Sequence, residues 1–122
     1  MTIHGLLLCD DLLFGSQITG AAHDLGCKVR MVRDVGTLSQ LTDEHQPSAV
    51  FLDLHSQNLD VDTLVKQIKN RKPAPLIIGF GSHVDTATLK AAQQAGCDLV
   101  LPRSALVQRL HVDLHGWLIR KV

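Results

Sequence analysis

The sequence carries no net charge, because twelve lysines and arginines balance twelve aspartates and glutamates. A neutral domain lacks the electrostatic footprint that nucleic acid or an anionic membrane surface requires, so we expect neither as a partner. It also has no apolar run near the roughly 20 residues of a membrane span. The N-terminus lacks the basic segment and long apolar core of a secretory signal. A cytoplasmic protein is the expectation.

Cysteine is scarce, with Cys9, Cys27 and Cys97 far apart and without C-x-x-C spacing. An odd, scattered set of this kind does not predict a disulfide framework or a zinc site, and each cysteine lies beside apolar residues. We therefore expect buried, reduced thiols.

The chain has 122 residues, of which 45% are hydrophobic, which suits one compact domain with a core of its own. We find no repeat, low-complexity tract or linker. Residues 1–122 are thus expected to form a single domain with no output domain.

Short apolar runs alternate with segments of helical periodicity along the whole chain. Most of these runs are continuously apolar, as in parallel strands that are covered on both faces. Helix signals between them include Ser16 and Thr37 as candidate starts, Asp60 or Asp62, Asp85, and a last helix over 104–121. This alternation predicts an α/β, flavodoxin-like (βα)5 fold, a doubly wound parallel sheet of order 2-1-3-4-5. The expected strands are 5–9, 28–32, 49–52, 76–80 and 99–101.

Acidic residues stand where two of these runs end: Asp10 and Asp11 after the first, Asp53 after the third. Ligands of doubly wound sheets bind beyond the carboxyl ends of the strands where strand order reverses, here between strands 1 and 3. Carboxylates gathered there repel one another unless a cation lies between them. Oxygen ligands of this kind suit Mg²⁺. Helix capping by the pair is the alternative.

These features resemble the receiver domain of two-component signalling over nearly the whole chain. By that resemblance Asp10 and Asp11 match the magnesium-binding acid pair, and Asp53 matches the aspartate that a histidine kinase phosphorylates. The backbone carbonyl of His55 would match a further metal ligand. The run Ala95-Gly96-Cys97-Asp98 resembles the segment that leads into the fifth strand of the family.

The other half of the expected site departs from the family pattern. Where the family has a Thr or Ser after strand 4, counting from Pro75 reaches Phe80, and Ser82 is the nearest hydroxyl. Where it has a lysine, this chain has Arg103, a planar fork rather than a compact donor. Its aromatic switch position is Val100, and the chain has no tyrosine. Ser82 and Arg103 are the candidates to support a phosphoryl group.

Leu110, Leu114 and Trp117 fall near one face of the last predicted helix. Core packing and a contact with a partner or a second copy are both open interpretations. In the resemblance, this region often carries partner contacts, so these three residues are the candidate interface.

Three functions follow from these expectations. The first is a stand-alone, non-enzymatic receiver-like domain that takes a phosphoryl group on Asp53 with Mg²⁺, served by a histidine kinase or another signalling protein. The second is a pseudo-receiver that binds a partner without phosphorylation. The third is a phosphatase or small hydrolase with Asp53 as nucleophile, for which the chain offers no evident general base or cap segment.

Overall fold

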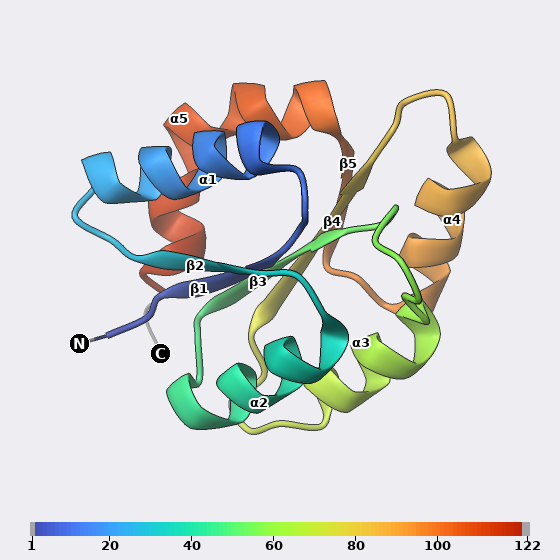
Figure 1. The fold of residues 1–122 in the computed structure, drawn as a ribbon, viewed down its shortest axis with the longest axis horizontal. Helices are drawn as coiled ribbons and strands as arrows, with labels where there is room; N and C mark the ends of the chain where they lie inside the picture. Colours follow the sequence, from blue (N-terminus) through green and yellow to red (C-terminus); the bar gives the residue numbers. More distant parts are fainter. Residues whose placement is uncertain (1, 121–122) are drawn as a thin grey trace.

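A five-stranded parallel sheet forms the centre of the computed structural model, which describes residues 2–120 (Figure 1). Its strand order is β2-β1-β3-β4-β5, so the predicted fold class and topology are confirmed. The strands are β1 (Gly5–Leu8), β2 (Val29–Val32), β3 (Ala49–Asp53), β4 (Leu76–Gly81) and β5 (Leu99–Pro102).

Five helices alternate with these strands and cover both faces of the sheet, as Figure 1 shows. On one face lie α1 (Leu12–Asp24) and α5 (Arg103–Leu118). On the other lie α2 (Val35–His45), α3 (Val61–Lys69) and α4 (Thr86–Ala95). Within residues 2–120, no helix has the length and apolar character needed to cross a bilayer.

The core is divided by the sheet into two layers, because successive side chains of a strand point to opposite faces. Leu7 and Phe51 pack in the cluster beneath α1 and α5. Leu6, Leu8 and Val50 pack in the cluster beneath α2, α3 and α4. Continuous apolar runs therefore supply both layers at once, which explains why the strands do not alternate in polarity.

Aspartates cap the first four helices. The side chain of Asp11 accepts a hydrogen bond from Phe14 N at the start of α1, and Asp34 does the same for Thr37 N in α2. The expected starts at Ser16 and Thr37 were therefore wrong by about one turn, whereas those at Asp60 and Asp85 are confirmed. The last helix begins at Arg103, and Lys121 at its predicted end lies outside the described residues.

The proposed contact face of the last helix is turned inward. Leu110, Leu114 and Trp117 are 5%, 0% and 8% exposed and belong to the core cluster under α1 and α5. The Trp117 ring also packs against Phe51, with ring centroids 6.1 Å apart. In the folded chain these three side chains pack against the sheet. The core-packing interpretation is therefore correct, and they do not form an exposed interface.

Replacing Trp117 by alanine tests this assignment. We expect Trp117→Ala to lower the free energy of unfolding by about 3–5 kcal/mol, because it opens a cavity against the sheet. Val112→Ala on the same helix is the matched control: Val112 is 81% exposed, and its truncation should change stability by less than about 0.5 kcal/mol. Urea unfolding measures both. A Trp117→Ala protein as stable as the Val112→Ala protein would contradict a core position.

The aspartate caps predict an acid dependence of stability. Hydrogen bonds from the Thr37 amide and hydroxyl lower the pKa of Asp34 below its ordinary value of 3.8, and the hydroxyl and amide of Thr63 lower that of Asp60. Because the pKa of each aspartate is lower in the folded than in the unfolded protein, the caps contribute fully to the free energy of unfolding above pH 3.8. They lose this contribution as the pH falls through the pKa values of the folded protein.

Asn remains a good N-cap but does not titrate, so Asp34→Asn with Asp60→Asn should flatten the loss of stability between about pH 5 and about pH 2. The urea midpoint measured across that range reports the effect. Asp24→Asn, outside any cap, is the control and should follow the wild-type curve.

Candidate functional site

Asp53 is the last residue of β3 and lies at the carboxyl edge of the sheet, only 4% exposed. It is set there by register, since Leu52 pairs with Leu8 of β1 and Asp53 with Phe80 of β4. Its Oδ1 accepts a hydrogen bond of 3.0 Å from His55 N. A carboxyl group this deep requires polar partners, and the neighbouring loops supply them.

Arg103 is the cationic partner of Asp53. Its Nη2 donates to Asp53 Oδ2 over 3.3 Å, and its Cζ lies 5.4 Å from the centroid of the Phe14 ring. Phe14 in turn stacks against Phe80 with centroids 5.1 Å apart, so an aromatic pair supports the guanidinium. The Nε of Arg103 is buried and has no hydrogen-bond partner among the described residues.

The position of Arg103 is locally unfavourable. It is the first residue of α5, where the helix dipole disfavours a cation, and Pro102 before it makes no side-chain cap. The pairing with Asp53 and the contact with Phe14 therefore hold a guanidinium at a place that helix chemistry alone would avoid.

Cys9 is a third neighbour of the Asp53 carboxyl group. Its Sγ lies 3.6 Å from Asp53 Oδ2 and 3.7 Å from the carbonyl oxygen of Asp11, within reach of both acceptors. Burial, with Asp53 adding to it, raises the pKa of the Cys9 thiol to about 11. The thiol is therefore a neutral donor at this edge. Cys9 and Cys27 are buried free thiols, as expected, and Cys97 is half-buried.

The two acidic residues after β1 differ in role. Asp11 uses its Oδ1 to cap α1, whereas Asp10 is exposed. Among residues 2–120, no three or more His, Cys, Asp or Glu side chains lie close enough together to hold a metal ion. The predicted gathering of Asp10, Asp11 and Asp53 is thus not seen among these residues, and Asp11 instead caps α1. Magnesium needs only one or two carboxylates with water, so Asp10 and Asp53 remain a chemically suitable donor pair.

The predicted hydroxyl support is also arranged differently from the expectation. Phe80, which the count from Pro75 reached, is fully buried beside Phe14. The hydroxyl of Ser82 accepts a local hydrogen bond from Val84 N over 3.4 Å. In this structure Ser82 therefore contributes its backbone to the site, through the contact with His55 described next.

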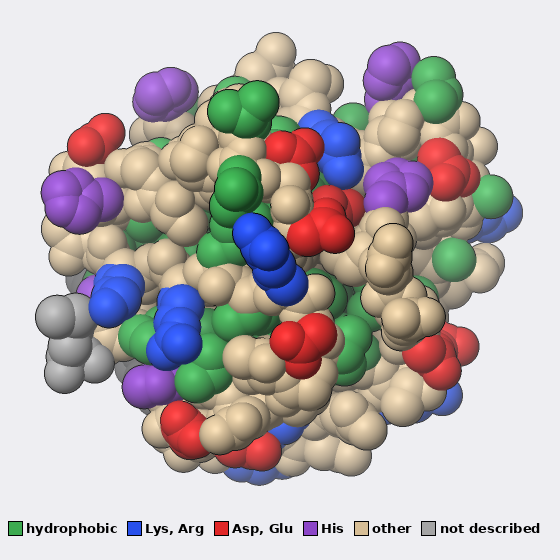
Figure 2. Space-filling model, in the orientation of Figure 1, with side chains coloured by type: hydrophobic (Ala, Val, Ile, Leu, Met, Phe, Trp, Pro, Cys, Tyr) green, Lys and Arg blue, Asp and Glu red, His purple; other side chains and the backbone are tan. Residues whose placement is uncertain are grey.

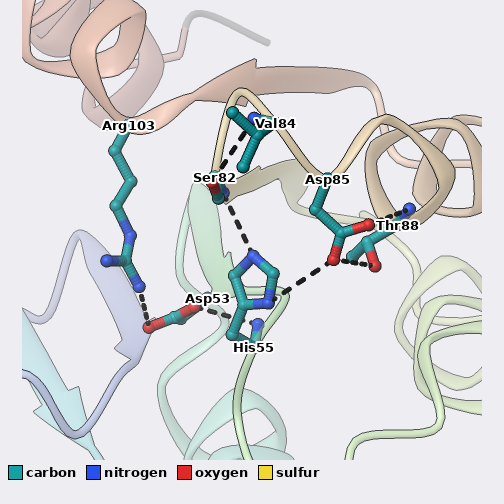
Figure 3. Close-up of polar contacts among 7 residues, drawn as sticks. All are labelled: Asp53, His55, Ser82, Val84, Asp85, Thr88 and Arg103. Atoms are coloured by element: carbon teal, nitrogen blue, oxygen red, sulfur yellow. Dashed lines mark hydrogen bonds and ion pairs between the residues drawn. The ribbon is translucent and has the colours of Figure 1, made fainter.

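His55 joins the loops after β3 and β4 (Figure 3). Its Nε2 accepts a hydrogen bond of 3.1 Å from Ser82 N, and its Nδ1 lies 3.9 Å from Asp85 Oδ2. Asp85 caps α4, and the hydroxyl and then the amide of Thr88 hold the pKa of Asp85 below its ordinary value, with a smaller contribution from His55. His55 thus contributes its side chain to this edge of the sheet, whereas only its backbone carbonyl was predicted to take part.

Cys9 and Phe14 were not identified from the sequence as contributors to this edge, and Asp85 was expected only as a helix start. The position of Cys9, directly before the acid pair, was the available signal for one of them. Figure 2 shows acidic and basic side chains interspersed over the face in view, without a large area of one sign.

No protein-family model and no curated protein sequence matches this chain. Several solved structures do match it. The receiver domain of NtrX from Brucella abortus superposes with a TM-score of 0.79 at 22% identity, covering 96% of this chain and 99% of that one. A response regulator from Hahella chejuensis gives a TM-score of 0.81 at 13% identity, covering 98% and 97%.

A structure of the NtrX chain from Brucella abortus is also matched, with a TM-score of 0.79 and 22% identity, but only 27% of that chain is covered. The chain described here therefore matches about a quarter of the length of that protein. At these identities the comparison establishes the fold: this chain has the fold of response regulator receiver domains.

The pair formed by Asp53 and Arg103 can be measured with a double-mutant cycle. We expect Asp53→Asn and Arg103→Gln to couple by about 1 kcal/mol in urea unfolding, a modest value because the Arg103 side chain is 38% exposed. A cycle with Arg30→Gln, on the exposed edge strand, is the control and should give no coupling. Coupling energies equal in the two cycles would show that Arg103 does not stabilise Asp53.

Proposed function

We propose that this chain is a receiver-like signalling module in which Asp53 accepts a phosphoryl group. The observation that carries the proposal is the pairing of a buried strand-end aspartate with Arg103, whose Nε is a buried donor without a partner among the described residues. A phosphoryl group brings oxygens that need such donors. A histidine kinase, or another protein that carries a phosphoryl group, would be the donor partner.

In the transfer, an Asp53 carboxyl oxygen attacks phosphorus, the bond from phosphorus to the donor atom breaks, and the leaving group departs with the electron pair. Charge on the equatorial oxygens must then be neutralised by positioned donors. Arg103 Nη2 lies 3.3 Å from Asp53 Oδ2, and the Nε–H of the same guanidinium is available as a further donor. Arg103 can therefore donate hydrogen bonds to the equatorial oxygens of the transferred group.

Asp10, Asp53 and the carbonyl of His55 are the oxygen ligands we assign to Mg²⁺, which would supply positive charge to the transferred group. The other contributions to the transfer come from side chains of the protein. Burial of Asp53 limits access of water, and the neutral Cys9 thiol fills the space beside Oδ2 without adding a charge. No turnover of a substrate is required, so the module is proposed as a signalling protein and not as an enzyme.

One observation favours the alternative of a phosphorylation-independent binding module. Neither Phe80 nor Gly81 presents a hydroxyl at the end of β4, and the Ser82 hydroxyl is used locally. If the fold acts only as a binding scaffold, Asp53→Asn will leave partner co-purification unchanged. If phosphorylation controls the partner, Asp53→Asn will change it.

Incubation with acetyl phosphate and Mg²⁺ tests the proposal. We expect intact-protein mass spectrometry to show the addition of one phosphoryl group to the wild type, none to Asp53→Asn, and none when a chelator removes the metal. Arg103→Gln should slow the addition by about tenfold to a hundredfold, since it removes a donor to the developing charge.

Arg30→Gln, which removes an exposed arginine far from the site in sequence, should react at the wild-type rate. Arg103→Lys should react faster than Arg103→Gln but more slowly than the wild type, since lysine keeps the positive charge but lacks the planar guanidinium with its several N–H donors. A wild-type mass that stays unchanged, or a gain that persists in Asp53→Asn, would refute the assignment of Asp53.

A further inference from the structure

One residue connects Asp53 to the start of α4. The backbone N–H of His55 donates to Asp53 Oδ1 over 3.0 Å, while its ring nitrogen Nε2 accepts from Ser82 N over 3.1 Å. Figure 3 shows the ring lying between the two loops, with Asp53 on one side and Ser82 and Asp85 on the other. His55 therefore contacts both the Asp53 carboxyl group and the β4–α4 loop.

The second nitrogen of the ring points toward the helix itself. Because Nε2 accepts a hydrogen bond, the proton of the neutral imidazole is on Nδ1, which faces Asp85 Oδ2 at 3.9 Å. Asp85 is the N-cap of α4, and its carboxylate accepts from Thr88 N over 3.2 Å and from Thr88 Oγ1 over 2.7 Å. The ring of His55 thus faces both the loop before α4 and the cap of that helix.

Gly81 gives the ring its space. A Cβ on Gly81 would lie 3.0 Å from His55 Nε2 and 3.4 Å from its Cδ2, a tight contact that the ring can relieve only by shifting. A side chain at position 81 would therefore crowd the imidazole at the nitrogen that accepts from Ser82 N. The glycine at the end of β4 and the histidine after β3 are therefore matched to each other.

We propose that His55 is the positioning residue that transmits the state of Asp53 to the first turn of α4. The inference rests on the proposed function and identifies how that site would be read out. When one Asp53 oxygen becomes part of an acyl phosphate, it accepts hydrogen bonds less well, and the His55 N–H turns toward the new phosphoryl oxygens. The ring moves with its backbone, and its contacts with Ser82 and Asp85 change. His55, with the space that Gly81 leaves for its ring, then performs the coupling for which neither Phe80 nor Gly81 at the end of β4 offers a hydroxyl.

The link in the unmodified protein is tested first, by amide hydrogen exchange. His55→Ala should increase the exchange rate of the Ser82 amide by about tenfold, the loss of one hydrogen bond. His55→Gln, whose side-chain oxygen can accept from the same amide, should restore most of the protection. Gly81→Ala should expose the Ser82 amide as His55→Ala does. His83→Ala, an exposed histidine of the same loop, is the control and should leave the rate unchanged.

The transmission is tested by amide chemical shifts with and without acetyl phosphate and Mg²⁺, with the mass of each sample measured. In the wild type we expect phosphorylation to shift the amides of residues 86–88. In His55→Ala, which keeps the backbone N–H and carbonyl, the shifts per phosphorylated molecule should fall to below about a third of the wild-type value, and His55→Gln should recover them. A wild type that gains no mass overturns the proposed function and the transmission together. Normal mass gain with undiminished α4 shifts in His55→Ala, or a Ser82 amide that is unaffected by that variant, overturns the role of His55 alone.

Discussion

The pairing of buried Asp53 with Arg103 determines how the carboxyl edge of the sheet is organised. The two residues are 50 positions apart, and their contact joins the end of β3 to the start of α5. A carboxyl group that is 4% exposed needs several polar partners, which come from Arg103, the amide of His55 and the thiol of Cys9. Those partners belong to the segments after three different strands, so satisfying one buried side chain brings together the whole candidate site.

The fold was predictable because its determinants are local. Continuous apolar runs identify strands that are covered on both faces, and the alternation with helices leaves few topologies. The starts of α1 and α2 were placed too late. Ser16 and Thr37 were taken as the first capping residues, with capping by the acid pair left as an alternative to a metal site, whereas Asp11 accepts from Phe14 N and Asp34 accepts from Thr37 N. A single carboxyl group has competing uses, and the sequence pattern does not rank them.

The site was predictable in its acidic half and not in its side-chain contacts. The strand-end position of Asp53 follows from the order of the elements, Arg103 was identified from the resemblance to receiver domains, and the structure does bring the two into contact. The position of the His55 ring could not be predicted in this way. It depends on the space left by Gly81, 26 positions later in the chain, and on the register of β3 with β4. The last helix shows the same limit: periodicity places Leu110, Leu114 and Trp117 on one face without saying whether the sheet or a partner covers it.

The usual residue preferences of helix starts and strands are not followed at the candidate site, although the other helix starts follow them. Helices α1 to α4 begin with an aspartate that caps the first turn, and α2, α3 and α4 add a threonine hydroxyl to the same carboxylate. Only α5 of the described helices begins with a cation and without a side-chain cap. A sequence that caps four helices well and the fifth badly has a competing requirement at that position, and the contact of Arg103 with Asp53 identifies it. The same reasoning applies to Gly81: a residue type that weakens a strand occupies the position where a Cβ would crowd the His55 ring.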